Sequence, residues 1–274
     1  MKSIDADLRP NTVIATAREV LEEGIAAVLV TVIEGENVGT KMLITKSGER
    51  SGTLTDANLD RVVQTHALAF LEMRDEVRTF KLSEFAPELA QFAGTKILFE
   101  RLEAEPRLII AGAGHVGASL ARLAALVGYD VTLIDDRAEF VARELFQEQS
   151  AKEIQLVAAQ DWQEAMQTAI RNGRGVSVAI VTRGHKQDED CLRATLTAGP
   201  DYIGMIGSKR RTNIVLQKLR DEGFAEEKLK RVRAPIGLDI GAVSPEEVAL
   251  AILAEIVAER RGGVGTPLSN WRRN

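Results

Sequence analysis

The chain has little cysteine, little histidine and no long apolar run, and each shortage excludes a class of protein. Its single cysteine, Cys191, excludes an intrachain disulfide and any multi-cysteine metal site, and three scattered histidines argue against a transition-metal centre. No apolar run approaches the roughly 18 residues of a membrane span, and residues 1–7 lack the apolar core of a signal peptide. With a net charge of −5 and no basic block, we expect no nucleic-acid or membrane partner. The sequence therefore predicts a cytoplasmic globular protein.

The length of 274 residues suits one large or two ordinary domains. A polar stretch that ends at Pro106 is the best boundary, because the strongest motif of the chain begins directly after it. We expect a smaller N-terminal α/β domain over residues 1–105 and a Rossmann-like domain over residues 106–263. The second domain should be a doubly wound, mainly parallel sheet of the α/β class. Residues 264–274 lack periodicity and are expected to form a loose tail.

The most informative motif is Gly-Ala-Gly-His-Val-Gly at residues 112–117. It follows an apolar strand pattern at residues 107–111 and precedes a helical pattern at residues 118–126. Three glycines in this spacing provide a tight turn, close backbone approach to a pyrophosphate, and close helix packing. Asp135 ends the next predicted strand, 23 positions after Gly112, near the spacing of about 20 expected for a carboxylate that binds a ribose hydroxyl. This order of a strand, a glycine-rich turn, a helix, a second strand and an acidic residue predicts a nucleotide-type fold.

Ligands of an open α/β sheet bind outside the carboxyl ends of its strands, and this rule selects four loops. Two of the three histidines fall on these loops, where proton transfer or hydrogen bonding to a ligand is available near neutral pH. Three cations follow a small turn on the last loop, an arrangement that suits a phosphate or carboxylate. The expected ligand-binding residues are Gly112, Gly114, His115, Val116 and Gly117, then Asp135, Asp136 and Arg137, then Arg183, His185 and Lys186, and finally Gly207, Ser208, Lys209 and Arg210, with Asp239 added from the glycine-rich residues 235–241.

Several of these residues have a structural alternative. His115 could merely shield a helix start, His185 could cap a loop, and the basic residues 209–211 could form a solvated face. Residues 235–241 either close over the ligand with Asp239 inward or form a buried turn before the last helix. Cys191 lies inside a predicted helix next to Leu192 and is interpreted as structural, and His66 lies on an apolar helix face and is interpreted as a core residue. No catalytic residue can be assigned, and enzymatic activity stays open.

These motifs together resemble the XdhC/CoxI family, accessory factors of molybdenum hydroxylases such as xanthine dehydrogenase. The stretches that carry the resemblance are residues 112–117, 135–137, 182–192, 202–211 and 234–247. The resemblance implies a protein that binds the molybdenum cofactor (molybdopterin), assists its sulfuration and delivers it to an apo-hydroxylase client. It leaves open a cysteine desulfurase as second partner and a homodimer as the assembly.

The N-terminal domain departs from the pattern of similar proteins. Where those proteins carry a Gly-Gly-Cys-Leu-Glu element, this chain has Asn58 in the cysteine position, and Phe92 stands where a Cys-Gly-Gly element begins. A thiolate is the soft ligand that would hold molybdenum or carry sulfur, and an amide does neither well. The departure predicts that any cofactor is held by the C-terminal domain without sulfur from this chain.

Two other functions fit the same residues. An NAD(P)-dependent oxidoreductase would use Asp135 on the ribose and His185 or Lys186 as proton donor, although no substrate-side acid-base set is evident. A non-catalytic ligand-binding or sensor protein would explain the absent cysteines.

Overall fold

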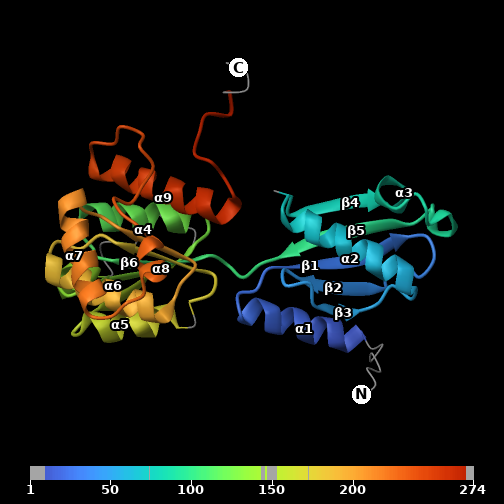
Figure 1. Cartoon of the computed structure of the whole chain (residues 1–274), viewed down its shortest axis with the longest axis horizontal. Helices are drawn as coiled ribbons and strands as arrows, with labels where there is room; N and C mark the ends of the chain where they lie inside the picture. Colours follow the sequence, from blue (N-terminus) through green and yellow to red (C-terminus); the bar gives the residue numbers. More distant parts are fainter. Residues whose placement is uncertain (1–9, 74, 143–145, 147–152, 172, 270–274) are drawn as a thin grey trace. The chain divides into compact units, whose positions relative to one another are not determined.

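The computed structural model describes residues 10–73, 75–142, 146, 153–171 and 173–269. The chain divides into two compact units, Met1–Ala104 and Glu105–Asn274, each with its own sheet and hydrophobic core (Figure 1). The expected tail, residues 264–274, lies partly outside the described residues. None of the described helices combines the length and apolar character needed to cross a membrane.

The N-terminal unit is an antiparallel sheet in the order β3-β2-β1-β5-β4 with helices on both faces. Because side chains alternate along a strand, Val28 and Val30 of β1 pack with α2, whereas Ala27 packs with α1. The elements are α1 (Pro10–Glu22), β1 (Ala27–Glu34), β2 (Lys41–Thr45), β3 (Arg50–Gly52), α2 (Ala57–Leu71), β4 (Val77–Lys81), α3 (Leu82–Phe85), the 3-10 turn η1 (Ala90–Phe92) and β5 (Lys96–Leu102).

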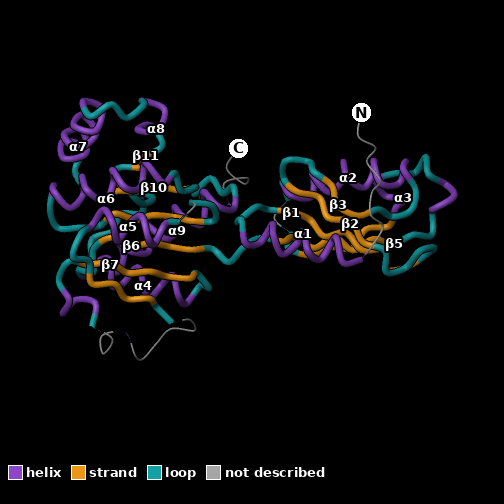
Figure 2. The backbone as a smooth tube through the Cα atoms, turned by 90° about the horizontal axis from the view of Figure 1, so that it is seen from below, coloured by secondary structure: helices purple, strands orange, loops and turns teal. Residues whose placement is uncertain are grey.

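The C-terminal unit is a parallel sheet in the order β11-β10-β9-β6-β7-β8. Figure 2 shows β11 and β7 on opposite sides of β6. The chain winds outward from β6 in one direction and returns to start again at β9, so the switch point of the sheet lies between β6 and β9. The first half comprises β6 (Arg107–Ala111), α4 (His115–Leu126), β7 (Asp130–Asp135), the 3-10 turn η2 (Ala138–Val141) and β8 (Gln155–Ala158). The second half comprises α5 (Trp162–Ile170), β9 (Val176–Ile180), α6 (His185–Ala198), β10 (Tyr202–Met205), α7 (Lys209–Asp221), α8 (Glu226–Lys230), β11 (Val232–Arg233) and α9 (Pro245–Arg261).

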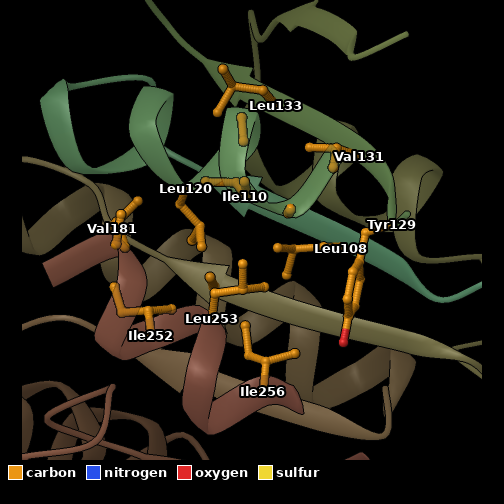
Figure 3. Close-up of a cluster of buried hydrophobic side chains, with 14 of the residues drawn as sticks. Leu108, Ile110, Leu120, Tyr129, Val131, Leu133, Val181, Ile252, Leu253 and Ile256 are labelled. Carbon is orange, nitrogen blue, oxygen red and sulfur yellow. The ribbon is translucent and has the colours of Figure 1, made fainter. Parts of the chain in front are cut away.

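Helices α4 and α9 cover one face of this sheet, and α5 and α6 cover the other (Figure 1). Strand β6 is buried on both sides: Leu108 and Ile110 belong to the core under α4 and α9, and Ile109 and Ala111 to the opposite core. Figure 3 shows Leu253 of α9 extending toward the β6 side chains. The continuous apolar run of β6 is thus the run of a doubly covered parallel strand, and the predicted fold class is confirmed.

Helix α9 begins with a capping box. The Ser244 hydroxyl accepts a hydrogen bond from the Glu247 amide at 3.2 Å, and the Glu247 carboxylate accepts one from the Ser244 amide at 2.9 Å. This reciprocal capping box satisfies amides that the helix leaves unpaired at its start. Among the helices and strands, β4, α3, α8 and β11 were not expected from the sequence pattern.

Candidate functional site

The glycine motif forms the turn between β6 and α4. Gly112 has a φ of +110°, a conformation that side chains rarely adopt, and a Cβ there would lie 2.6 Å from the Val181 carbonyl oxygen. A Cβ on Gly117 would lie 1.8 Å from the Gly112 carbonyl oxygen. These two glycines are required by the fold itself, because each brings two backbone segments into contact.

Gly114 differs from its two neighbours in the motif. It is the N-cap residue of α4, with a φ of −64° and a ψ of −176° that any residue can adopt, and no described atom lies within 4 Å of its Cβ position. The missing side chain therefore leaves open space in front of the α4 N-terminus. Unpaired amides at a helix N-terminus favour an anion, so this space suits a phosphate group.

The end of β7 is tied to the glycine loop through Asp135. This carboxyl group is 1% exposed and accepts the Ala113 amide at 2.7 Å. Arg137 adds its own amide at 3.0 Å and two guanidinium contacts at 2.8 and 2.9 Å. Burial raises the pKa of Asp135, but the hydrogen bonds from Arg137 and Ala113 outweigh it and hold the pKa below its ordinary value.

The next carboxylate links the ends of β7 and β9. Asp136 Oδ2 lies 3.3 Å from Arg183 Nη2, and Asp136 Oδ1 lies 3.9 Å from Arg137 Nε. The guanidinium of Arg137 also lies over the Phe140 ring, 3.7 Å from its centroid. The loops after β6, β7 and β9 thus form one connected set of contacts at the switch point of the sheet.

A buried cluster that was not predicted as part of the site connects the loop after β9 to α7. Asp188 of α6 is fully buried, accepts the Thr182 hydroxyl at 2.5 Å and pairs with the Arg211 guanidinium. Burial raises the pKa of Asp188, while Thr182 and Arg211 oppose the rise. The cluster fixes the starts of α6 and α7 relative to each other, and a signal for it was present, since Asp188 lies in the first turn of α6.

The start of α7 carries the predicted basic residues. Ser208 is the N-cap and accepts the Arg211 amide at 3.3 Å, whereas Lys209 and Arg210 are exposed. Beside the glycine Gly207, two buried polar atoms have no hydrogen-bond partner among the described residues, namely Arg211 Nε and Thr212 Oγ1. This loop therefore offers donors as well as charge.

The remaining predicted residues lie at the same edge of the sheet or near it. His115 opens α4 and His185 opens α6; both are exposed, as is Lys186, and Val116 packs partly against the core. Because β6, β7, β9 and β10 are neighbours in the sheet, the four loops share one edge, but the structure gives no direct contact between the two histidines.

Residues 235–241 form a turn against α9. Ile236 is buried and its amide donates to the Met205 carbonyl at 3.1 Å, while the Gly237 amide donates to Glu255. Asp239 is exposed. These contacts favour the interpretation as a buried turn before the last helix over closure on a ligand.

Both residues interpreted as core are packed among apolar neighbours. Cys191 is fully buried, and burial raises the pKa of its thiol well above the ordinary value. His66 stacks on Phe85, with 4.0 Å between ring centroids, and burial lowers its pKa. Asn58, by contrast, is exposed at the start of α2.

A parallel sheet in this order with a glycine-rich turn at its switch point defines a Rossmann-type unit. Two family models match the chain: the XdhC Rossmann domain over residues 108–256 and the XdhC and CoxI family over residues 20–81. The chain belongs to the XdhC/CoxI family, which confirms the predicted resemblance.

Curated relatives are similar over much of the chain. Uncharacterized protein YqeB of Escherichia coli is 30% identical over 82% of this chain and 41% of its own length. A probable xanthine dehydrogenase subunit of Bacillus subtilis is 28% identical over 89% of this chain and 64% of its own length. The molybdenum cofactor insertion chaperone PaoD of E. coli is 28% identical over 56% of this chain and 40% of its own length. The chain thus spans about two fifths to two thirds of the length of these relatives.

The fold has a counterpart among solved structures. The crystal structure of a xanthine dehydrogenase from Bacillus halodurans superposes with a TM-score of 0.60, covering 94% of this chain and 69% of that one at 22% identity. At this identity the likeness shows the fold alone.

Proposed function

We propose that this chain is an accessory protein of a xanthine dehydrogenase-type molybdenum hydroxylase, and that it carries the molybdenum cofactor to that enzyme as cargo. Membership of the XdhC/CoxI family supports the accessory role. The names of two relatives, a molybdenum cofactor insertion chaperone and a probable component of a xanthine dehydrogenase, point to the same process.

The observation that carries the proposal is the difference between the three glycines. Gly112 and Gly117 are closed in by backbone, whereas the Cβ position of Gly114 faces open space at the α4 N-terminus. The fold does not need a glycine there, but an anion that approaches the helix amides does.

The donor set fits the phosphate end of the cofactor and does not supply a thiolate for its metal. Helix amides near Gly114 and the guanidinium groups of Arg137 and Arg183 are phosphate donors. Cys191 is fully buried with a raised pKa, so its thiol is neither accessible nor ionised. The molybdenum centre supplies hydroxylation chemistry once it is in the client, and sulfur for it would come from another protein such as a cysteine desulfurase.

The test is hydroxylase activity in cells that lack the chain. Reintroduced wild-type protein should restore activity, and Gly114→Val should not, because a branched side chain fills the space in front of the α4 amides. Ala225→Val is the matched control, since it places the same valine side chain at the exposed N-cap of α8. Equal rescue by Gly114→Val and Ala225→Val, at equal protein levels, would remove the role assigned to the glycine loop.

A further inference from the structure

Asp135 stands at the position that usually binds a ribose in this fold, but all of its hydrogen-bond acceptor positions are already occupied. A carboxylate offers about four lone-pair positions to hydrogen-bond donors. Asp135 uses two on each oxygen: Oδ1 accepts the amide and Nε of Arg137, and Oδ2 accepts the Ala113 amide and Nη2 of Arg137. All four bonds measure 2.7 to 3.0 Å. A ribose diol would have to displace one of these donors from a group that is 1% exposed.

The neighbouring acid does not replace it. Asp136 pairs with Arg183 at 3.3 Å, and its side chain is 29% exposed. Each carboxylate at the end of β7 is thus matched with a guanidinium that reaches further into solvent: the Arg137 side chain is 23% exposed and that of Arg183 is 54% exposed. Asp135 and Asp136 hold the two guanidinium groups in place, and those guanidinium groups are hydrogen-bond donors.

We propose that the end of β7 recognises a phosphate monoester in place of a ribose diol. Arg137 and Arg183 determine this specificity, and Asp135 is a positioning residue that holds Arg137 and the glycine loop. Guanidinium donors match phosphate oxygens in geometry and charge, whereas a diol needs an acceptor. The inference rests on the proposed function in one respect: the phosphate of a pterin cargo is one source of the monoester, and the 2′-phosphate of NADP is the other.

Calorimetry on the full chain separates these ligands. Wild-type protein should bind molybdopterin and bind NAD⁺ at least about 10-fold more weakly, since one charged hydrogen bond is worth about that factor. Arg137→Met frees two acceptor positions on Asp135 and should gain about 10-fold in NAD⁺ affinity while losing about 10-fold for molybdopterin. The double variant Arg137→Met/Asp135→Asn should not show this increase in NAD⁺ affinity. Arg183→Met, which leaves Asp135 untouched, should weaken molybdopterin without improving NAD⁺.

The outcomes distinguish this inference from the proposed function. Tight NAD⁺ binding by the wild type that Asp136→Asn abolishes would overturn the inference, because Asp136 would then accept the diol. No NAD⁺ gain in a folded Arg137→Met protein, verified by its melting curve, would overturn it as well. Binding of NADP⁺ without binding of molybdopterin would support the proposed preference for a phosphate monoester and would refute the proposal that the cofactor is the cargo.

Discussion

Substitutions at Gly114 and Gly117 should have opposite consequences, although the residues are three positions apart in one motif. An added Cβ at Gly117 lies 1.8 Å from the Gly112 carbonyl oxygen, well inside van der Waals contact with backbone that β6 holds in place. We expect Gly117→Ala to destabilise the protein by about 3 kcal/mol, the upper end of ordinary overpacking. For a unit of this size that is a fall of about 6–12 °C in the melting temperature.

The Cβ that Gly114→Val adds meets no described atom within 4 Å, and the backbone angles at this position are allowed for valine. Its effect on stability should stay within about 1 kcal/mol, the order of an N-cap substitution. Its effect on the ligand should be large, because loss of one charged hydrogen bond to phosphate weakens binding about 10-fold or more.

Scanning calorimetry measures the first effect and titration calorimetry with molybdopterin measures the second. Ala225→Val serves as the control in both assays. A Gly114→Val protein that melts early and binds normally would refute this division of roles among the glycines.

Other regions of the chain give independent tests. Asp188→Ala should lower the free energy of unfolding in urea by about 3–5 kcal/mol, because it leaves the Arg211 guanidinium without its buried partner. The double variant Asp188→Leu/Arg211→Met should recover most of that loss. Equal stability of the single and double variants would contradict the role of the pair. Burial holds the pKa of His66 below its ordinary value of 6.5, so the unfolded chain takes up the proton first and stability should fall as the pH drops below 6.5. His66→Phe should reduce this pH dependence of the melting temperature. An unchanged pH dependence would show that other groups cause it. Cys191→Ser should lose roughly 1–3 kcal/mol of stability and bind molybdopterin as the wild type does, whereas loss of a thiol-dependent sulfuration in this variant would show that the buried thiol is used.

The sequence pattern predicts the parts of the fold whose side chains are buried in a regular period. The predicted strand at residues 107–111 matches β6, because it is a short apolar run with clear ends. Strand β4 was missed because only Phe80 among its residues is buried, so no alternation is visible. Strand β11 has two residues and leaves no pattern at all.

Within the site, the sequence predicts which loops lie together, but it does not predict which polar atoms are left free to bind a ligand. Asp135 stands at the spacing of a ribose-binding acid, and nothing in that spacing reveals that Arg137 fills its lone pairs. The pairing depends on where a long side chain turns after β7, which is a tertiary property. Asp188 and Arg211 are 23 positions apart in the sequence, and the place of Asp188 in the first turn of α6 does not reveal that Arg211 of α7 is its partner.

Native mass spectrometry of the protein, purified without oxygen from the organism that makes it, tests the central claim most directly. The account predicts a bound mass equal to that of a molybdenum-containing pterin, present in the wild type and in Ala225→Val and lost in Gly114→Val. A nicotinamide dinucleotide as the bound species, or a pterin that Gly114→Val retains in full, would contradict it.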